Sequence, residues 1–180
     1  MDSKSNIDKI KKPFSIGIIG GGQLALMLVE AAKERGLKVC VQTKSNKDPA
    51  GLYCDFVIEA DPLQLKGNKS LIKDCEKIIF ENEWIKIDKL KQLKSDDFFI
   101  PKLEAIQPLV DRISQKKFID KLNLPTPKWI PLKAFINKEE ESHSICNFPL
   151  MAKSFKGGYD GKGNKKIINK EDLQSFINKN

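Results

Sequence analysis

The sequence predicts an α/β protein: a parallel sheet covered by helices, followed by a second, smaller unit. Two observations support this fold class. Short apolar segments alternate with segments of helical apolar spacing over residues 14–93, which is the pattern of a parallel sheet packed between helices. A proline-containing segment and a glycine-rich loop then follow residue 100. The 180 residues, 40% of them hydrophobic, are enough for a folded core, which argues against general disorder.

Each element of the first unit follows from a local pattern. Residues 14–19 form an apolar strand that ends directly at glycines. Residues 23–35 have apolar side chains at helical spacing up to Gly36, which ends the helix. The remaining elements are shorter: we expect strands at residues 38–42, 56–58 and 77–80, and helices around residues 70–75 and 87–93.

The pattern changes near residues 100–108, where we expect the boundary between two units. Residues 111–122 predict a helix with one apolar side, and Pro125 and Pro127 end it. We then expect strands at residues 129–132, 150–155 and 165–168 and a helix at residues 171–177. The predicted organisation is a flexible arm (1–13), a parallel-sheet domain (14–104) and the start of a second domain (105–180).

The arm and the cysteines bound the location of the protein. Residues 1–13 are polar, which predicts a flexible arm and not a secretory signal. The sequence contains no run of about 18 apolar residues, so we expect no membrane-spanning helix. Cys40, Cys54, Cys75 and Cys146 form no C-x-x-C pair, and His143 is the only histidine. This pattern argues against zinc and predicts a cytoplasmic protein. The composition would allow a Cys–His nucleophile pair, but no motif flanks His143 or any of the cysteines.

The net charge of +8 raises the alternative of a nucleic-acid partner. Of 32 basic residues, only Arg35 and Arg112 are arginines, and the lysines are dispersed. A solvated lysine-rich surface therefore explains the charge better than a nucleic-acid face, whose affinity would fall steeply with salt. Lysine cannot replace the planar two-point contact of arginine, so each arginine is a candidate functional residue.

The first glycine loop, residues 20–25, fits G-x-G-x-x-G/A between a strand and a helix. Free amides at a helix N-terminus suit an anion. A nicotinamide cofactor also needs an acidic residue at the end of the second strand, but that strand ends at Gln42 and Thr43. A nicotinamide-dependent oxidoreductase is thereby weakened. The remaining alternative is that the glycines only allow the helix and the strand to pack closely.

The second glycine loop, Gly157 to Gly163, lies between two strands. It is not a Walker A loop, because Gly163 stands where a Ser or Thr would bind magnesium. A hairpin tip with four glycines can fold its amides over phosphates. Lys153, in the preceding apolar strand, is expected to meet a negative charge. The alternative is an ordinary hairpin turn with an edge lysine.

Four segments in this order resemble the N5-carboxyaminoimidazole ribonucleotide synthases, the ATP-grasp enzymes of purine biosynthesis. The tract G-G-Y-D-G-K-G is close to diagnostic within ATP-grasp proteins, whereas G-G-G-Q-L alone is weak. The order and spacing of all four make the resemblance strong. The segments are residues 15–24, 80–84, 111–116 with 124–127, and 153–163.

The resemblance implies a Rossmann-like parallel-sheet domain, the pre-ATP-grasp domain, followed by an incomplete ATP-grasp domain. It implies a carbon–nitrogen ligase that uses ATP and bicarbonate to carboxylate the exocyclic amine of 5-aminoimidazole ribonucleotide, through carboxyphosphate, with release of ADP and phosphate. The expected partners are these small molecules, with no nucleic acid and no membrane, and the resemblance also suggests a homodimer.

The resemblance assigns binding residues but no catalytic or metal-binding residue. Phosphoryl transfer is mostly positioning and charge neutralisation, which suits fixed cations and backbone amides. For Arg112, Glu81 and Glu83, an ordinary surface position is the alternative. The residues expected to bind ATP are Arg112, Lys153, Gly158, Tyr159, Asp160, Gly161, Lys162 and Gly163. The residues expected to bind the ribonucleotide are Gln23, Leu24, Glu81, Glu83, Tyr159 and Asp160.

Three departures from the family pattern matter. Ala25 and Leu26 replace a Gly-Arg pair, which removes an anion contact. Residues 80–84 read Phe-Glu-Asn-Glu-Trp where Tyr-Glu-Phe-Glu-Asn is commoner, so the register of the glutamates stays open. Family members continue beyond Asn180 with the adenine-binding segment, the acidic magnesium ligands and a further domain. We therefore expect a part of a longer enzyme that is inactive alone; a non-catalytic binding module is the alternative.

Overall fold

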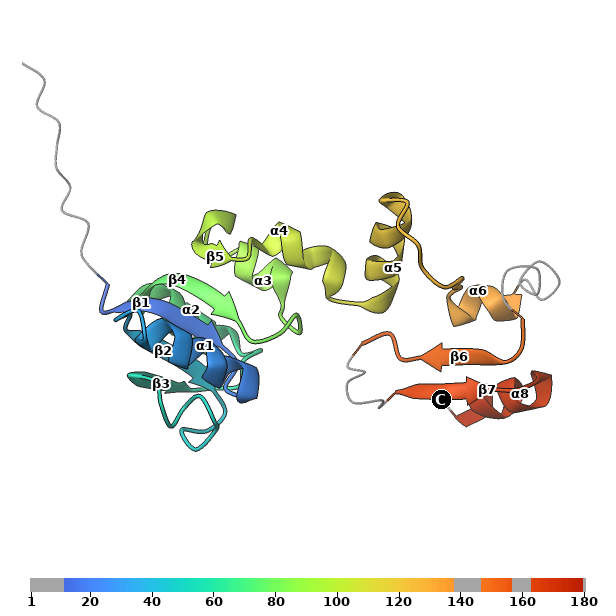
Figure 1. Cartoon of the computed structure of the whole chain (residues 1–180), viewed down its shortest axis with the longest axis horizontal. Coiled ribbons are helices and arrows are strands. Elements are labelled where there is room, and N and C mark those ends of the chain that lie inside the picture. The colour runs from blue at the N-terminus through green and yellow to red at the C-terminus, as the bar shows by residue number, and fades with distance from the viewer. Residues whose placement is uncertain (1–11, 138–146, 157–162, 180) are drawn as a thin grey trace, which may run out of the picture. The chain divides into compact units, whose positions relative to one another are not determined.

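The computed structural model of the chain describes residues 12–137, 147–156 and 163–179. The chain divides into two compact units, Met1–Gln107 and Pro108–Asn180. The first unit contains a five-stranded sheet in the order β3-β2-β1-β4-β5 (Figure 1), and all of its strand pairs are parallel. Its elements are β1 (Phe14–Ile19), α1 (Gln23–Lys33), β2 (Val39–Thr43), β3 (Phe56–Glu59), α2 (Leu65–Asp74), β4 (Cys75–Phe80), α3 (Ile87–Lys91), η1 (Asp96–Phe98), β5 (Phe99–Ile100) and α4 (Leu103–Ile106).

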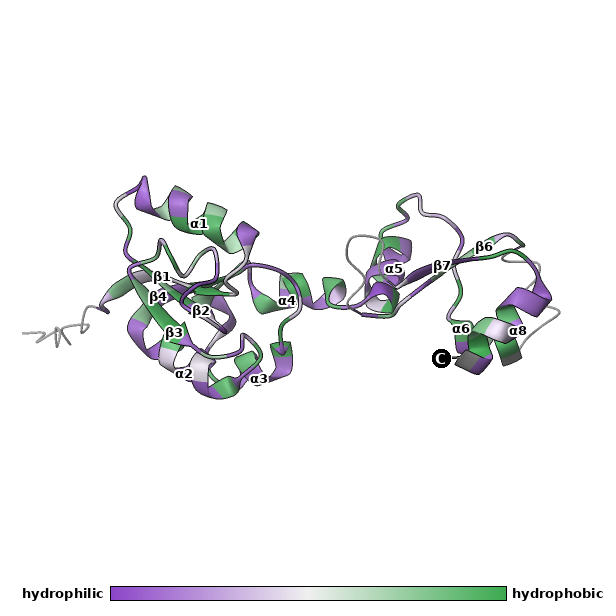
Figure 2. Ribbon diagram, turned by 90° about the horizontal axis from the view of Figure 1, so that it is seen from below, coloured by the Kyte–Doolittle hydropathy of each residue, from purple (hydrophilic) through white to green (hydrophobic). Residues whose placement is uncertain are grey.

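Helices cover both faces of this sheet, with α1 on one face and α2 on the other (Figure 2). Because successive side chains of a strand point to opposite faces, the central strand β1 packs against both helices. Ile18 is fully buried in a cluster with Val29 of α1. The next residue back, Gly17, leaves room for α2, since a Cβ there would lie 2.8 Å from Cγ of Leu71.

The strand order reverses between β1 and β4. The chain passes from β1 outward to β2 and β3, and then returns to β4 on the other side of β1. The loops that follow β1 and β4 therefore leave the same edge of the sheet in different directions. Open α/β sheets bind ligands at the carboxyl ends of their strands, at this kind of topological switch point.

The second unit contains an antiparallel hairpin with helices (Figure 1). Leu150 pairs with Ile167 at its open end, and Lys153 pairs with Asn164 next to the connecting loop. A short helix, η2 (Gln107–Leu109), spans the boundary between the units. The other elements are α5 (Arg112–Lys121), α6 (Leu132–Asn137), β6 (Leu150–Lys153), β7 (Asn164–Ile167) and α8 (Lys170–Lys179).

The predicted α/β class and its central parallel sheet are confirmed, but one predicted strand is wrong. Residues 129–131 have no regular structure, and Leu132 begins α6. The carbonyl of Pro131 accepts a hydrogen bond from the Phe135 N–H at 3.0 Å, so this proline starts a helical turn. A four-residue apolar run does not by itself distinguish a strand from the entry to a helix.

The sequence also missed several short elements. β5 has two residues and α4 has four, too few to show a period. Helix α2 begins at Leu65, five residues before the predicted stretch. The apolar pattern missed its first part because Gly67 and Asn68, and not apolar residues, are buried there. Within the described residues, no helix combines the length and apolar character needed to cross a bilayer.

Candidate functional site

The loop after β1 approaches the end of β4 so closely that only glycines fit. A Cβ at Gly20 or Gly22 would overlap the carboxylate of Glu81. Gly20 also has a φ of +118°, a conformation that residues with a Cβ rarely adopt. The N–H of Glu81 donates to the carbonyl of Ile19 at 3.0 Å, which continues the pairing of the two strands beyond their ends. The glycine loop and Glu81 thus form one packed unit at the switch point.

The carboxylate of Glu81 occupies the N-terminus of α1. Its Oε2 accepts a hydrogen bond from the Gly22 N–H at 3.1 Å. Gly22 is the N-cap of α1, which has no side-chain cap and no acidic residue in its first turn. Glu81 therefore supplies, from a distant strand, the negative charge that a helix N-terminus favours. A phosphate placed at this amide would have to compete with a carboxylate of the protein itself.

The end of β2 also differs from a dinucleotide site. Thr43 is 2% exposed, and a Cβ at Gly21 would overlap its side chain. Its hydroxyl donates to the carboxylate of Asp48, which also accepts from the Ser45 N–H at 3.3 Å. The preceding residue, Gln42, is fully buried and donates to the carbonyl of Asp61 at 2.8 Å. The residues at the ribose-anchor position are thus used within the fold, which argues against a nicotinamide cofactor.

Four of the predicted ribonucleotide-binding residues lie in the first unit, at the start of α1 and directly after β4, and they differ in exposure. Gln23 and Leu24 begin α1 and are exposed, Leu24 at 57%. Of the two glutamates, Glu81 contacts the glycine loop, whereas Glu83 is exposed. This difference distinguishes two residues that the sequence could not separate.

The loop after β4 contains an aromatic residue that the sequence analysis did not single out. Trp84 is 41% exposed, and its backbone N–H donates to Oδ1 of Asn82 at 2.9 Å. An exposed tryptophan in a turn at the carboxyl end of a central strand is the signal that could have identified it. The structure explains the apolar residues that stand where the family has Gly-Arg. Ala25 is fully buried, and Leu26 packs partly buried against the same core.

In the second unit, Arg112 and Lys153 come from elements that are directly joined. The backbone N–H of Arg112, the first residue of α5, donates to the carbonyl of Phe155 at 3.1 Å, just beyond β6. Lys153 is exposed and is the last residue of β6. The Ser154 N–H donates to the carbonyl of Gly163 at 2.7 Å and closes the base of the hairpin loop. The structure thus brings Arg112, Lys153 and Gly163 to one end of the hairpin.

The other residues predicted in this loop, Gly158, Tyr159, Asp160, Gly161 and Lys162, lie outside the described residues. The structure therefore leaves their assignment to ATP or to the ribonucleotide as a prediction.

Asp111 fixes the start of α5. Its Oδ1 accepts from the Ser114 N–H at 2.8 Å and its Oδ2 from the Ser114 hydroxyl at 2.8 Å. Burial by itself would raise the pKa of Asp111, but the hydrogen bonds from Ser114, with a further one from the Ile113 backbone and the charge of Lys156, together lower the pKa below its ordinary value of 3.8. A charged N-cap at neutral pH holds the helix end that bears Arg112.

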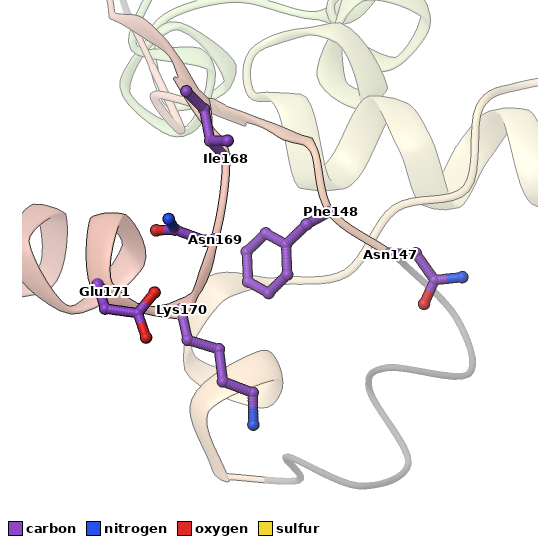
Figure 3. A pocket seen from close by; sticks show the side chains of 6 residues that line it. All are labelled: Asn147, Phe148, Ile168, Asn169, Lys170 and Glu171. Atoms are coloured by element: carbon purple, nitrogen blue, oxygen red, sulfur yellow. The ribbon is translucent and has the colours of Figure 1, made fainter.

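Two pockets lie beside the second unit's hairpin, away from Lys153. One, of about 490 Å³, opens at the end where Leu150 pairs with Ile167 (Figure 3). That is the opposite end from Lys153 and Asn164, so this pocket is not part of the predicted ATP site. It is lined by Asn147, Phe148, Ile168, Asn169, Lys170 and Glu171.

The described thiols offer no nucleophile, and the described acidic residues form no metal site. Cys40 and Cys75 are buried, and the neighbouring Cys75 thiol together with burial raises the pKa of Cys40. Cys146 and His143 lie outside the described residues. Over residues 12–137, 147–156 and 163–179, no group of three or more His, Cys, Asp or Glu side chains is arranged to hold a metal ion.

A family model described as the ribonucleotide synthetase preATP-grasp domain matches residues 14–109, more than half of the chain. The chain belongs to this family. A model of the ATP-grasp domain matches residues 117–180. The two matches follow each other in the order that the motifs predicted.

Curated relatives named N5-carboxyaminoimidazole ribonucleotide synthase confirm the resemblance. The protein of Synechococcus elongatus is 35% identical over 90% of this chain and 41% of its own length. That of Staphylococcus aureus is 34% identical over 94% of this chain and 45% of its own length. The chain therefore spans less than half the length of these relatives.

Solved structures of such synthases have the same fold. The Staphylococcus aureus enzyme complexed with ADP superimposes with a TM-score of 0.83 at 32% identity, over 96% of this chain and 46% of that one. The Aspergillus clavatus enzyme complexed with ATP gives a TM-score of 0.78 at 26% identity, over 92% of this chain and 44% of that one. This chain accordingly has the fold of the first part of these structures, a preATP-grasp domain followed by part of an ATP-grasp domain.

Proposed function

We propose that this chain supplies the ribonucleotide-binding domain and part of the ATP-binding domain for the carboxylation of 5-aminoimidazole ribonucleotide. In this reaction bicarbonate and ATP yield N5-carboxyaminoimidazole ribonucleotide, ADP and phosphate. One observation carries the proposal. A glycine loop bound to Glu81 and a hairpin that joins Lys153 to Arg112 occur in one chain, and this chain is similar over 90% of its length to a relative named for this product.

The proposed chemistry has two steps. A bicarbonate oxygen attacks the γ-phosphorus of ATP, the bond to ADP breaks, and carboxyphosphate forms. The exocyclic amine then attacks the carboxyl carbon, the carbon–oxygen bond to phosphate breaks, and the amine loses a proton. Arg112 and Lys153 would neutralise the phosphates.

We assign the other residues to the two substrates. Gln23, Leu24 and Glu81 would face the ribonucleotide, with Glu83, Tyr159 and Asp160 as further candidates. Residues 158–163 would cover the nucleotide. Magnesium would enter with ATP as its counter-ion, and we assign no step or ligand to it because the described residues contain no suitable acidic cluster.

The remaining parts of the proposal concern organisation and location. We propose domains at residues 14–104 and 105–180 after an arm of 13 residues. We also propose that the protein forms a homodimer and works in the cytoplasm. The free thiols of Cys40, Cys54 and Cys75 support a reducing location.

A chimaera tests the proposed function. This chain would replace the matched part of the Staphylococcus aureus synthase, and phosphate release from ATP would be measured with and without aminoimidazole ribonucleotide. We expect release that depends on both the ribonucleotide and bicarbonate, and a loss of at least a hundredfold in the Lys153→Met variant. A folded chimaera that releases phosphate equally with and without the ribonucleotide would refute the proposal.

A further inference from the structure

The β6–β7 hairpin has two faces of opposite character. Residues directly opposite each other on paired strands lie on the same face. On the inner face, Ile167 is 1% exposed, and Lys165 forms an ion pair with Asp172 of α8 at 3.3 Å. The Lys165 ammonium also lies 5.6 Å from the centre of the Phe176 ring. The packing of α8 therefore fixes which side chains of β7 face inward.

The outer face consists of exposed residues only. Met151 pairs with Lys166, and Lys153 pairs with Asn164, and all four are exposed. Lys153 and Lys166 are diagonal neighbours on this face, a position at which two residues lie about 7–8 Å apart, with their Cβ atoms somewhat closer. Both long side chains can therefore reach one anion.

The charges on the outer face are not balanced by the described part of the protein. Lys165 has its carboxylate partner on α8, whereas no carboxylate of the described residues pairs with Lys153 or Lys166. Two neighbouring cations on paired strands repel each other. A bound polyanion would attract both lysines and so offset the repulsion between them.

We propose that Lys166 is a second phosphate-binding cation of the nucleotide site. It would act with Lys153 to hold the polyphosphate of a nucleoside triphosphate on the outer face of the hairpin, with Met151 as the apolar surface beside it. This inference rests on the proposed function, which places ATP at Lys153. It adds a binding residue, and it defines the outer face by the strand register.

Adjacent lysines on opposite faces of β7 provide a matched test. ATP affinity of the same Staphylococcus aureus chimaera would be measured by calorimetry with the unchanged chain, Lys166→Gln and Lys165→Gln, with thermal unfolding as the check of folding. We expect about tenfold weaker binding for Lys166→Gln, because one charge-assisted contact is lost. Lys165→Gln should stay within about twofold of wild type, since that side chain faces α8.

The salt dependence gives a readout that a purely structural role would not change. We expect the affinity of Lys166→Gln to fall less steeply with salt than that of wild type, while Lys165→Gln keeps the wild-type slope. Equal losses in the two variants would indicate a general charge effect and overturn the inference.

A third variant separates the two proposals. If Lys153→Gln weakens ATP binding and Lys166→Gln does not, the inference about Lys166 fails and the proposed function stands. If wild type shows no ATP binding, or if neither variant weakens it, both fail.

Discussion

Glu81 links the two loops of the switch point through a single carboxylate. Its hydrogen bond from Gly22 fixes the N-terminus of α1, and that helix presents Gln23 and Leu24. The residue therefore has a structural role and, under the proposed function, a substrate-binding one.

Replacement of Glu81 by alanine should affect both roles. Loss of a capping interaction costs about 1 kcal/mol of unfolding free energy. We expect a destabilisation of this size in the first unit, measured by denaturant unfolding, and at least a tenfold loss of affinity for aminoimidazole ribonucleotide in calorimetry.

Glu83 offers the matched control two residues away. Because its side chain is exposed, Glu83→Ala should change the unfolding free energy by less than about 0.5 kcal/mol and reduce the ribonucleotide affinity less than Glu81→Ala does. A larger loss of affinity from Glu83→Ala than from Glu81→Ala would reverse the assignment.

At this scale, the sequence predicted candidate residues but not their contacts. Two glutamates spaced two apart could each face the glycine loop, and only the path of the chain after β4 decides between them. The sequence likewise could not decide which of Lys165 and Lys166 points toward α8, because this depends on how α8 packs against the hairpin. Arg112 was noticed because the chain has only two arginines, which is a property that sequence alone shows.

Among the elements, α5 depends strongly on its cap. None of its residues is buried, so packing supports it less than it supports α1. Asp111→Ala should therefore destabilise the second unit by about 1 kcal/mol at pH 7, measured by thermal unfolding followed by circular dichroism.

The pH dependence of this effect follows from the lowered pKa of Asp111. Because the folded pKa lies below 3.8, the carboxylate stabilises the folded state above that pH. This contribution is lost as the pH falls through the folded pKa. The difference between wild type and Asp111→Ala should hence shrink below about pH 4; a difference that persists unchanged to pH 2 would contradict the account.

Elements with a clear apolar pattern were predictable, and elements without one were not. β1 begins and ends as predicted, and α1 ends two residues before its predicted end. The apolar run at residues 129–132 was wrongly predicted as a strand, since four residues fit either structure until Pro131 begins a turn. The clarity of the apolar pattern, and not element length alone, thus decided what the sequence could predict.

At the scale of the whole molecule, each unit contains one group of candidate ligand-binding residues. The first has the glycine loop with Glu81, and the second has Lys153 with the start of α5. The order of the motifs predicted this arrangement, because each motif belongs to a separate unit and needs no contact between units. The roles of residues 158–162 stay predictions.

The most direct test of this account is hydrogen exchange of this chain within the Staphylococcus aureus chimaera, followed by mass spectrometry, with each ligand in turn. Aminoimidazole ribonucleotide should protect residues 20–26 and 81–84 in the first unit. ATP should protect residues 112–116, 151–156 and 163–168 in the second. Protection of the same segments by both ligands, or of none of these segments by either, would contradict the assignment of the glycine loop with Glu81 to the ribonucleotide and of Arg112 and Lys153 to ATP.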